Sequence, residues 1–380
     1  ETSLTLLPTA SLKRLWKLKL KLLSPRYAYI WVLIFFLIML ISFKNDYSEG
    51  CHPRILEALG RNNLVQQDGY GADIYSEKAK SLIKQKCDAA DADVHFVSGG
   101  TQANMLVIAA SLRAHESVIS TTTGHIYTNE TGAIEATGHK INAVEGVDGK
   151  LTPSHIQQVL DGHSNKPHVL KQRMVYISNS TEMGTIYTKS ELKALYTFCQ
   201  ANDLYLFMDG ARLGSALMAA DNDLTLADIA SYTDVFWIGG TKNGALLGEA
   251  IVITNSVLQE DFAYHIKQRG AMLAKGMVLG TQFLELFKDN LYFDLASYAN
   301  EQAMRIKQAL IGYGCIFWAE TTTNQLFPIL SNDQIAQLSQ KFAFHHWKKI
   351  DENHSAIRLI TSWATTDERV EHFIKALKKV

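Results

Sequence analysis

Seven short runs of apolar, β-branched and aromatic residues recur along the chain, and they constrain the fold more than any other feature. Each run has four or five residues, and the runs alternate with longer helix-like segments such as TQANMLVIAASLRA and KSELKALYTFCQAN. This alternation predicts an α/β domain with a mainly parallel sheet of seven strands. The runs are DVHFV, SVIS, KINAV, MVYIS, LYLFM, DVFWI and EAIVI, which begin at residues 93, 117, 140, 174, 204, 234 and 249.

The pattern changes at about residue 289. A long helical stretch is followed by CIFWAE and QLFPIL, a helix near DQIAQLSQKFAF, the strand AIRLITSW and a closing helix. We therefore predict a large α/β domain over residues 43–288 and a small C-terminal α+β domain over residues 289–380. The chain has 380 residues, of which 47% are hydrophobic and 20% charged, and this is ample for a sizeable core.

The first 42 residues form a basic and hydrophobic leader. SLKRLWKLKLKLLSPR is basic, and the segment 27–43, YAYIWVLIFFLIMLISF, is an almost unbroken apolar run. The run is short for a membrane span and suits a signal-peptide core, although no small-residue cleavage site follows it. Two interpretations stay open: a signal or membrane anchor, or an over-extended start in front of a domain that begins at Met39.

Charge and cysteine usage exclude several classes of protein. The first 38 residues carry six Lys and Arg side chains and one acidic side chain, so the chain's formal charge of −1 leaves −6 for the rest. A body with this charge is a poor partner for nucleic acid. The cysteines at 51, 87, 199 and 315 form no CxxC pair and no cluster with histidines, which argues against a zinc site or a disulfide framework. We expect no metal ion and a reducing cytoplasm.

Polar motifs follow three of the predicted strands. SGGTQAN after DVHFV is a Gly-Gly turn that opens a helix, where free backbone N–H groups can hold a phosphate. Asp209 ends the strand LYLFM and needs a cationic partner, either Arg212 or a ligand cation such as a protonated ring nitrogen. Lys242 lies in GGTKNGALLG, where neighbours without a Cβ would let its amine approach a bulky ligand; a flexible turn with a surface lysine has the same composition.

These three features, in this order, meet the needs of pyridoxal 5′-phosphate. That cofactor requires a helix N-terminus for its phosphate, a carboxylate for its pyridinium nitrogen, and a lysine that forms a Schiff base with its aldehyde. We therefore predict that the large domain binds pyridoxal 5′-phosphate. The alternative is a nucleotide-binding or purely structural α/β protein in which Lys242 is incidental.

Eight longer segments carry a resemblance to a known family. They are KNDYSEG, GYGADIYSEKAKSLI, SGGTQAN, GHIYTNETGAIEATGHK, SNSTEMGTIY, MDGARLGSAL, GGTKNGALLGEAIVI and RGAMLAKG. Over residues 43–380 the chain resembles the threonine aldolase and β-eliminating lyase family of pyridoxal phosphate enzymes, which implies fold type I, the aspartate aminotransferase-like fold. One departure is Ser180 in SNSTE, where relatives often have a proline that would fix the turn.

The resemblance implies roles for seven residues at the cofactor. Lys242 would form the Schiff base, and Asp209 would pair with the pyridinium nitrogen. His125 would stack on the ring, and Arg212 would lie near the phenolic oxygen. The phosphate would be held by three neighbouring residues, Gly99, Gly100 and Thr101.

The resemblance also implies substrate contacts and a partner subunit. Arg358 in AIRLITSW would clamp the substrate carboxylate, a geometry that suits a guanidinium fork, although a strand-edge arginine stays an alternative. Asn45 and Tyr70 would contact the substrate as well. Because Tyr70 and Lys275 resemble positions that reach a neighbouring active site, we expect a homodimer or homotetramer with shared sites. Several relatives have arginine where Lys275 stands, so bidentate contact with a phosphate would be lost there.

The reaction implied by the resemblance is cleavage of the Cα–Cβ bond of a β-hydroxy amino acid of the L-threonine or L-allo-threonine type. The products are glycine and an aldehyde. His125, His139 or a bound water would accept the proton of the β-hydroxyl group. Motifs alone do not determine which bond at Cα breaks, so a β-eliminating lyase or an aminotransferase that acts on another amino acid stays an alternative.

Overall fold

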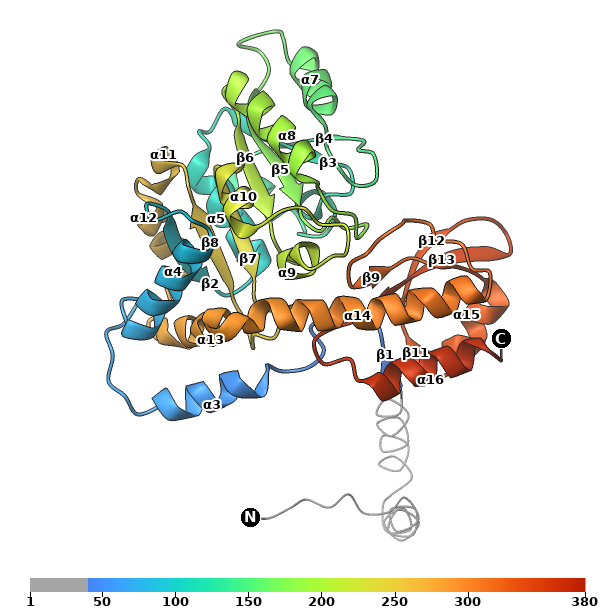
Figure 1. Cartoon of the computed structure of the whole chain (residues 1–380). Helices are drawn as coiled ribbons and strands as arrows, with labels where there is room; N and C mark the ends of the chain where they lie inside the picture. The colour runs from blue at the N-terminus through green and yellow to red at the C-terminus, as the bar shows by residue number, and fades with distance from the viewer. Residues whose placement is uncertain (1–39, 380) are drawn as a thin grey trace, which may run out of the picture.

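The computed structural model describes residues 40–379 (Figure 1). The predicted leader lies almost wholly outside the described residues, and so do the proposed start at Met39 and most of the apolar run 27–43. In the part of the chain that is described, no helix combines the length and the apolar character needed to cross a membrane.

The large domain is built on a seven-stranded sheet, and all seven predicted runs are strands in it. The strand order is β2-β8-β7-β6-β5-β3-β4, and β8 is antiparallel to both of its neighbours while the other pairs are parallel. The prediction of a mainly parallel seven-stranded sheet is therefore confirmed. The strands are β2 (Asp93–Val97), β3 (Glu116–Thr121), β4 (Ile141–Val144), β5 (Lys171–Ser178), β6 (Tyr205–Asp209), β7 (Val235–Gly239) and β8 (Glu249–Ile253).

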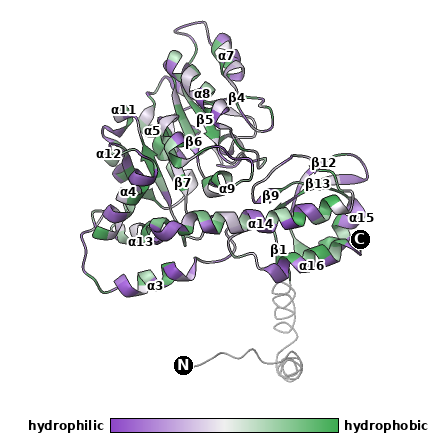
Figure 2. Ribbon diagram, in the orientation of Figure 1, coloured by the Kyte–Doolittle hydropathy of each residue, from purple (hydrophilic) through white to green (hydrophobic). Residues whose placement is uncertain are grey.

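Successive residues of each central strand enter two different cores, one on each face of the sheet. In β7, Val235 and Trp237 belong to one core while Phe236 and Ile238 belong to the other. This is why the strand sequences are continuously apolar rather than alternating. Figure 2 shows these strands in the colours of hydrophobic residues. One core contains side chains of α5 (Gly100–Ser111), α6 (His125–Thr128), α11 (Ser256–Gln259) and α12 (Phe262–Gln268).

The opposite face of the sheet packs against a larger group of helices. Several begin with a capping box, for example Thr188 with Glu191 at the start of α8, in which side chains satisfy the free N–H groups of the first turn. Two short 3₁₀ helices cover 135–137 and 288–290. The helices of this face are α3 (Pro53–Asn62), α4 (Ile74–Lys86), α7 (Pro153–Gly162), α8 (Lys189–Ala201), α9 (Leu213–Leu217), α10 (Leu226–Ser231) and α13 (Met277–Phe287).

A single long helix, α14 (Leu291–Gly312), connects the large sheet domain to a small C-terminal one (Figure 1). It packs against α9 on one side and against α16 and β9 on the other. The small sheet has the order β10-β13-β12, with β9 also paired to β13. The elements of the small domain are β9 (Gln325–Leu326), β10 (Ile329–Ser331), α15 (Asn332–Leu338), β11 (Phe342–Ala343), β12 (His345–Lys349), β13 (His354–Ile360) and α16 (Asp367–Leu377).

The small domain departs from the sequence pattern in three places. QLFPIL forms two strands rather than one, because Pro328 between them has no N–H for the ladder. The predicted helix at 333–344 ends at Leu338, and the alternation of buried Phe342 and Phe344 belongs to extended chain that includes β11. In CIFWAE only Phe317 makes a bridge, with Pro328, and β12 was not predicted.

The first described residues belong to the small domain. Ile41 and Ser42 form β1, which pairs in parallel with β11. Phe43 is fully buried between Phe342 and Phe373, at ring-centroid distances of 6.2 and 5.3 Å. Phe43 and the partly buried Ile41 thus pack into the C-terminal core, while the domain boundaries expected from the sequence stay a prediction.

Candidate active site

A cavity of about 360 Å³ lies at the ends of the large-domain strands. Ser98 follows β2, Ser178 and Asp209 end β5 and β6, and Lys242 follows β7, so the parallel strands direct their carboxyl ends towards one site. Of the residues predicted for the site, seven line this cavity: Gly99, Gly100, Thr101, His125, Asp209, Arg212 and Lys242.

Asp209 is a buried carboxylate held by three donors. Its Oδ2 accepts hydrogen bonds from the Tyr176 hydroxyl at 2.6 Å and from Asn104 Nδ2 at 3.2 Å, and its Oδ1 accepts one from the backbone N–H of Ala211 at 2.9 Å. The indole N–H of Trp237 fixes Asn104 in turn, at 3.0 Å. The donors hold the carboxylate at the cavity wall, where it can face a cationic ligand atom.

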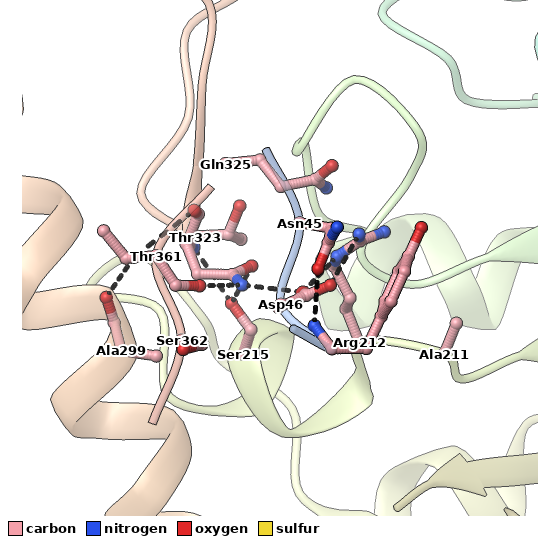
Figure 3. A network of polar contacts seen from close by, with 12 residues as sticks. Asn45, Asp46, Ala211, Arg212, Ser215, Ala299, Thr323, Gln325, Thr361 and Ser362 are labelled. Carbon is pink, nitrogen blue, oxygen red and sulfur yellow. Dashed lines mark hydrogen bonds and ion pairs between the residues drawn. The ribbon is translucent and has the colours of Figure 1, made fainter. Parts of the chain in front are cut away.

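Arg212 does not pair with Asp209, although the sequence left that possibility open. Its Nε and Nη2 donate to Asp46 at 2.7 and 3.0 Å, a bidentate ion pair that is buried (Figure 3). Asn324 of the small domain also donates to Asp46, at 2.9 Å. Burial alone would raise the pKa of Asp46, but the charges of Arg212 and Lys242 outweigh this effect and hold it below its ordinary value. Asp46 therefore stays ionised and joins the two domains beside the cavity.

Lys242 is half-buried and lines the cavity wall. Across residues 40–379, no hydrogen bond or ion pair involves its Nζ atom. Burial and the positive charge of Arg212 lower the pKa of Lys242, which makes the neutral, nucleophilic form of the amine more accessible. Close by, Glu249 accepts a hydrogen bond from the Gly240 N–H at 2.8 Å, and burial raises the pKa of Glu249 to about 7.

The glycines around Lys242 are required by the protein backbone rather than by access of a ligand. A Cβ on Gly239 would approach the carbonyl oxygen of Ala211 to 2.5 Å, and one on Gly240 would approach that of Gly248 to 2.6 Å. Gly244 has φ +93°, a conformation that favours glycine. Lys242 lines the cavity, and the glycines beside it allow the turn after β7 to pack closely against its neighbours.

The N-terminus of α5 faces the cavity without a side-chain cap. Gly99 is the N-cap residue, no side chain caps it, and the first turn has no acidic residue. A Cβ on Gly99 would meet no atom within 4 Å, whereas one on Gly100 would approach the Trp237 ring to 2.9 Å. The free N–H groups and the helix dipole make this end of α5 suitable for an anion.

His125 belongs to a buried polar network at the same cavity. Its Nδ1 is 2.9 Å from Glu130 Oε1, which also accepts from Asn104 Nδ2 at 2.7 Å. Burial alone would lower the pKa of His125, but the hydrogen bond to Glu130 and the charges of Asp209 and Glu130 outweigh it and raise the pKa. With Glu130 ionised, Nδ1 carries the proton and Nε2 is left as a base.

Glu182, at the other side of His125, holds the backbone of this segment. Its Oε1 accepts hydrogen bonds from the His125 N–H at 2.9 Å and from the Ser178 hydroxyl at 2.8 Å. Burial and the charge of Asp209 raise the pKa of Glu182. The turn that carries Ser180 in place of proline is closed by Thr181, whose N–H donates to the carbonyl oxygen of Thr185 at 2.9 Å.

Four predicted site residues lie outside the cavity lining. Asn45 Oδ1 accepts from the Tyr47 N–H at 3.0 Å and the Ser48 hydroxyl at 2.8 Å, so it shapes the turn that carries Tyr47 to the cavity. Arg358 lies on β13, close enough for the charges of Asp46 and Arg212 to act on it. The other two, Tyr70 and Lys275, are exposed on a different part of the surface.

His139 lies away from the cavity. It is buried, and its Nδ1 contacts the carbonyl oxygen of Glu116 at 3.2 Å. Of the two histidines considered as proton acceptors, only His125 lines the cavity.

Replacing Glu130 by glutamine is expected to lower the pKa of His125, because the negative charge beside Nδ1 is lost. If neutral Nε2 accepts the substrate proton, activity falls as the pH decreases through this pKa. The acid limb of the kcat/KM profile of Glu130→Gln should therefore move to lower pH. NMR titration of His125 gives its pKa independently, and Glu135→Gln, an exposed carboxylate nearby, is the matched control. An unmoved acid limb would refute this role of Glu130.

Comparison with known proteins places this chain in a family. A family model described as beta-eliminating lyase matches residues 49–333. A low specificity L-threonine aldolase of Pseudomonas aeruginosa is 32% identical over 343 residues, which cover 89% of this chain and 97% of that protein. A threonine aldolase structure from Leishmania major is 47% identical, with a TM-score of 0.88 and coverage of 89% of this chain and 99% of that one.

A more distant structure extends the likeness in fold. An aspartate aminotransferase variant from Thermus thermophilus has a TM-score of 0.66 at 14% identity and covers 94% of this chain and 99% of its own. This likeness confirms the predicted fold type I. At this level of identity it supports a statement about the fold alone. By the family model and the long alignment with the Pseudomonas enzyme, the chain belongs to the beta-eliminating lyase family and is a homologue of the low-specificity L-threonine aldolases.

Proposed function

We propose that this protein is a pyridoxal 5′-phosphate-dependent lyase that cleaves the Cα–Cβ bond of β-hydroxy amino acids of the L-threonine or L-allo-threonine type. The products are glycine and an aldehyde. The observation that carries the proposal is one cavity lined by an uncapped helix N-terminus, a buried carboxylate and a half-buried amine that has no hydrogen-bond or ion-pair partner among the described residues. The same chain is 47% identical to a threonine aldolase over nearly its whole length.

The residues of the cavity fit pyridoxal 5′-phosphate at each of its polar groups. The free N–H groups of α5 suit the phosphate, and the space beside Gly99 accommodates it. Asp209 presents a fixed carboxylate for the ring nitrogen, and Lys242 presents an amine of lowered pKa for the aldehyde. His125 lines the cavity as a ring that can stack on the cofactor.

When bound, pyridoxal 5′-phosphate supplies a ring that accepts the electron pair left at Cα as the Cα–Cβ bond breaks. Asp209 would face the ring nitrogen and favour its protonated form, which strengthens the electron acceptor. Lys242 would hold the cofactor through its aldehyde group. Arg212, fixed by Asp46, lines the same wall and would add positive charge to the cofactor site.

The chain's own proton acceptor is His125. Its Nε2 accepts the proton of the β-hydroxyl group. As the Cα–Cβ bond breaks, the C–O single bond becomes the carbonyl double bond of the departing aldehyde. Glu130 holds the opposite ring nitrogen as a donor and stabilises the imidazolium that forms. The raised pKa of His125 matches this base role at neutral pH.

The substrate carboxylate is bound by Arg358, and Asn45 and Tyr70 contribute to substrate binding. The proposal for Arg358 is supported by its half-buried guanidinium, which has no ion-pair partner among residues 40–379. Because Tyr70 and Lys275 are exposed and lie outside this chain's cavity lining, we propose that they serve a neighbouring subunit in a homodimer or homotetramer. We also propose a cytoplasmic location for the enzyme.

Aldehyde release from L-threonine, L-allo-threonine and β-phenylserine by the protein reconstituted with pyridoxal 5′-phosphate tests the proposal. We expect stoichiometric glycine and aldehyde. Formation of pyruvate and ammonia from serine or cysteine derivatives, without aldehyde from any of the three substrates, would assign a β-elimination instead. Absence of both products and of cofactor absorbance would overturn the cofactor as well.

A further inference from the structure

Arg358 is an arginine whose charge has no acidic partner. It lies in β13 of the small sheet and is half-buried, and its Nε is fully buried without a hydrogen-bond acceptor. Among the described residues no hydrogen bond or ion pair involves its guanidinium. A buried cation of this kind is costly unless something compensates its charge, so its surroundings require an explanation.

The side chain that contacts Arg358 is an aromatic ring. Cζ of Arg358 lies over the ring of Trp347, 4.8 Å from its centroid, which is a cation–π contact. The face of the indole ring attracts the cation, but unlike a carboxylate it does not take up the N–H groups of the guanidinium in a salt bridge. The guanidinium is thus held in place while its hydrogen-bond donors stay available for another group.

A β-bulge places Trp347 at this position. On β12, His346 pairs with Ile357 and Lys348 pairs with Ala356, so Trp347 is an extra residue without a partner on β13. Bulges of this kind re-aim a side chain and are frequent beside functional sites. Here the bulge brings an indole ring from the neighbouring strand onto Arg358.

The ring of Trp347 is itself supported from the side. It packs edge-on against Phe327, which is fully buried, at 5.0 Å between centroids, and against Trp318 at 6.0 Å. Trp318 makes a cation–π contact with Lys348, whose Nζ lies 5.4 Å from the centroid of the Trp318 ring. The indole of Trp347 is therefore part of a packed cluster and not a mobile surface side chain.

We propose that Trp347 is a positioning residue, which holds the guanidinium of Arg358 so that its N–H groups remain free to bind the carboxylate of an α-amino acid. This inference rests on the proposed function, which supplies the ligand. The charged groups around Arg358 agree with it. Arg212 adds positive charge, while Asp46, a carboxylate whose charge acts on Arg358 together with the phenol of Tyr47, is already engaged by Arg212 in a bidentate pair.

The geometry also explains why an acidic neighbour would serve less well. A carboxylate on β12 would occupy the N–H groups of Arg358 and compete with the substrate for them. His345, directly opposite Arg358 on β12, has a pKa lowered by burial and by the charge of Arg358, which disfavours its charged form. Both strand neighbours thus leave the cation free to pair with a ligand anion.

The test compares ligands with and without a carboxylate. Binding of glycine and of glycinamide to the holoenzyme is measured by calorimetry for wild type, Trp347→Leu, Trp347→Phe and the matched control Phe317→Leu, which removes a ring under another cation, Lys307. We expect Trp347→Leu to weaken glycine binding about tenfold and to leave glycinamide binding within about twofold. Trp347→Phe, which retains a ring, should lie between, and Phe317→Leu should resemble wild type. In steady state, KM for L-threonine should rise while kcat changes little.

Several outcomes would overturn the proposal. Glycine binding by Trp347→Leu at the wild-type level is one, and an equal loss for glycine and glycinamide is another, because it marks a general structural defect. If Trp347→Leu does not fold, Trp347→Phe decides, and with unaltered thermal unfolding it should bind glycine more weakly than wild type. Wild-type glycine affinity in both Trp347→Phe and Trp347→His, a poorer π partner, would refute the proposal. If the wild-type enzyme binds glycine but releases no aldehyde, the aldolase function alone is contradicted. If the wild-type enzyme binds glycine and glycinamide with equal affinity, the structure has no carboxylate-binding site at Arg358.

Discussion

Replacing Lys242 by alanine should abolish turnover, with kcat falling by about 10⁴-fold. The amine is the one cavity-lining group able to bond covalently to the cofactor's aldehyde, and its lowered pKa reflects burial and the nearby Arg212. Alanine leaves the turn after β7 intact, because the glycines that allow its packing are unchanged. Aldehyde release from L-allo-threonine gives kcat for the variant.

A second measurement separates loss of covalent attachment from loss of folding. Borohydride treatment of the wild-type holoenzyme should fix the cofactor to the peptide that contains Lys242, as shown by mass spectrometry. Lys242→Arg keeps the charge but provides no nucleophilic amine, so it should also be inactive and resist labelling. Labelling at another lysine in the wild type would contradict the assignment.

Replacing Asp209 by asparagine should lower kcat/KM by about 10²- to 10³-fold. The side chain keeps its shape, but the negative charge that holds a proton on the ring nitrogen is removed. The donors around it, Tyr176, Asn104 and the Ala211 N–H, were arranged for an acceptor, so the new amide group also lacks a suitable partner. Cofactor affinity should weaken as well, measured by equilibrium dialysis.

Tyr176→Phe is the matched control for Asp209. It removes one hydrogen bond to the carboxylate and retains the charge, so we expect a loss of no more than about tenfold. If both variants lose the same activity, the charge of Asp209 is not what the reaction requires. The thermal midpoint of each variant shows whether the buried network still folds.

The large domain could be predicted from sequence because its signal is local. Each strand is buried on both faces, so runs such as DVFWI are apolar throughout and stand out against amphipathic helices. The strands of the small domain are short and weakly patterned. HHWKK, which forms β12, has one apolar residue in five, and its strand character comes from pairing with β13. No local pattern carries that information.

Residues of the candidate site could be predicted where a side chain with suitable chemistry stands directly after a predicted strand. Asp209 and Lys242 stand directly after strands, and the sheet then brings their side chains to one edge. Asp46 was not identified individually, although its segment KNDYSEG was, because its partner Arg212 is 166 residues away. Glu130 was missed for a related reason, since its contact with Asn104 of α5 appears only when the segments that follow β2 and β3 meet.

The pairing of β1 with β11 has a consequence for the order in which the protein acquires its active site during synthesis. Segments leave the ribosome from the N-terminus onwards, so β1 emerges long before its partner at Phe342–Ala343. Asn324, which donates to Asp46, also emerges only late in synthesis, so Asp46 lacks this contact for most of that time. The large sheet can form first, but the nascent chain becomes competent for catalysis only when its earliest described strand docks onto one of its last.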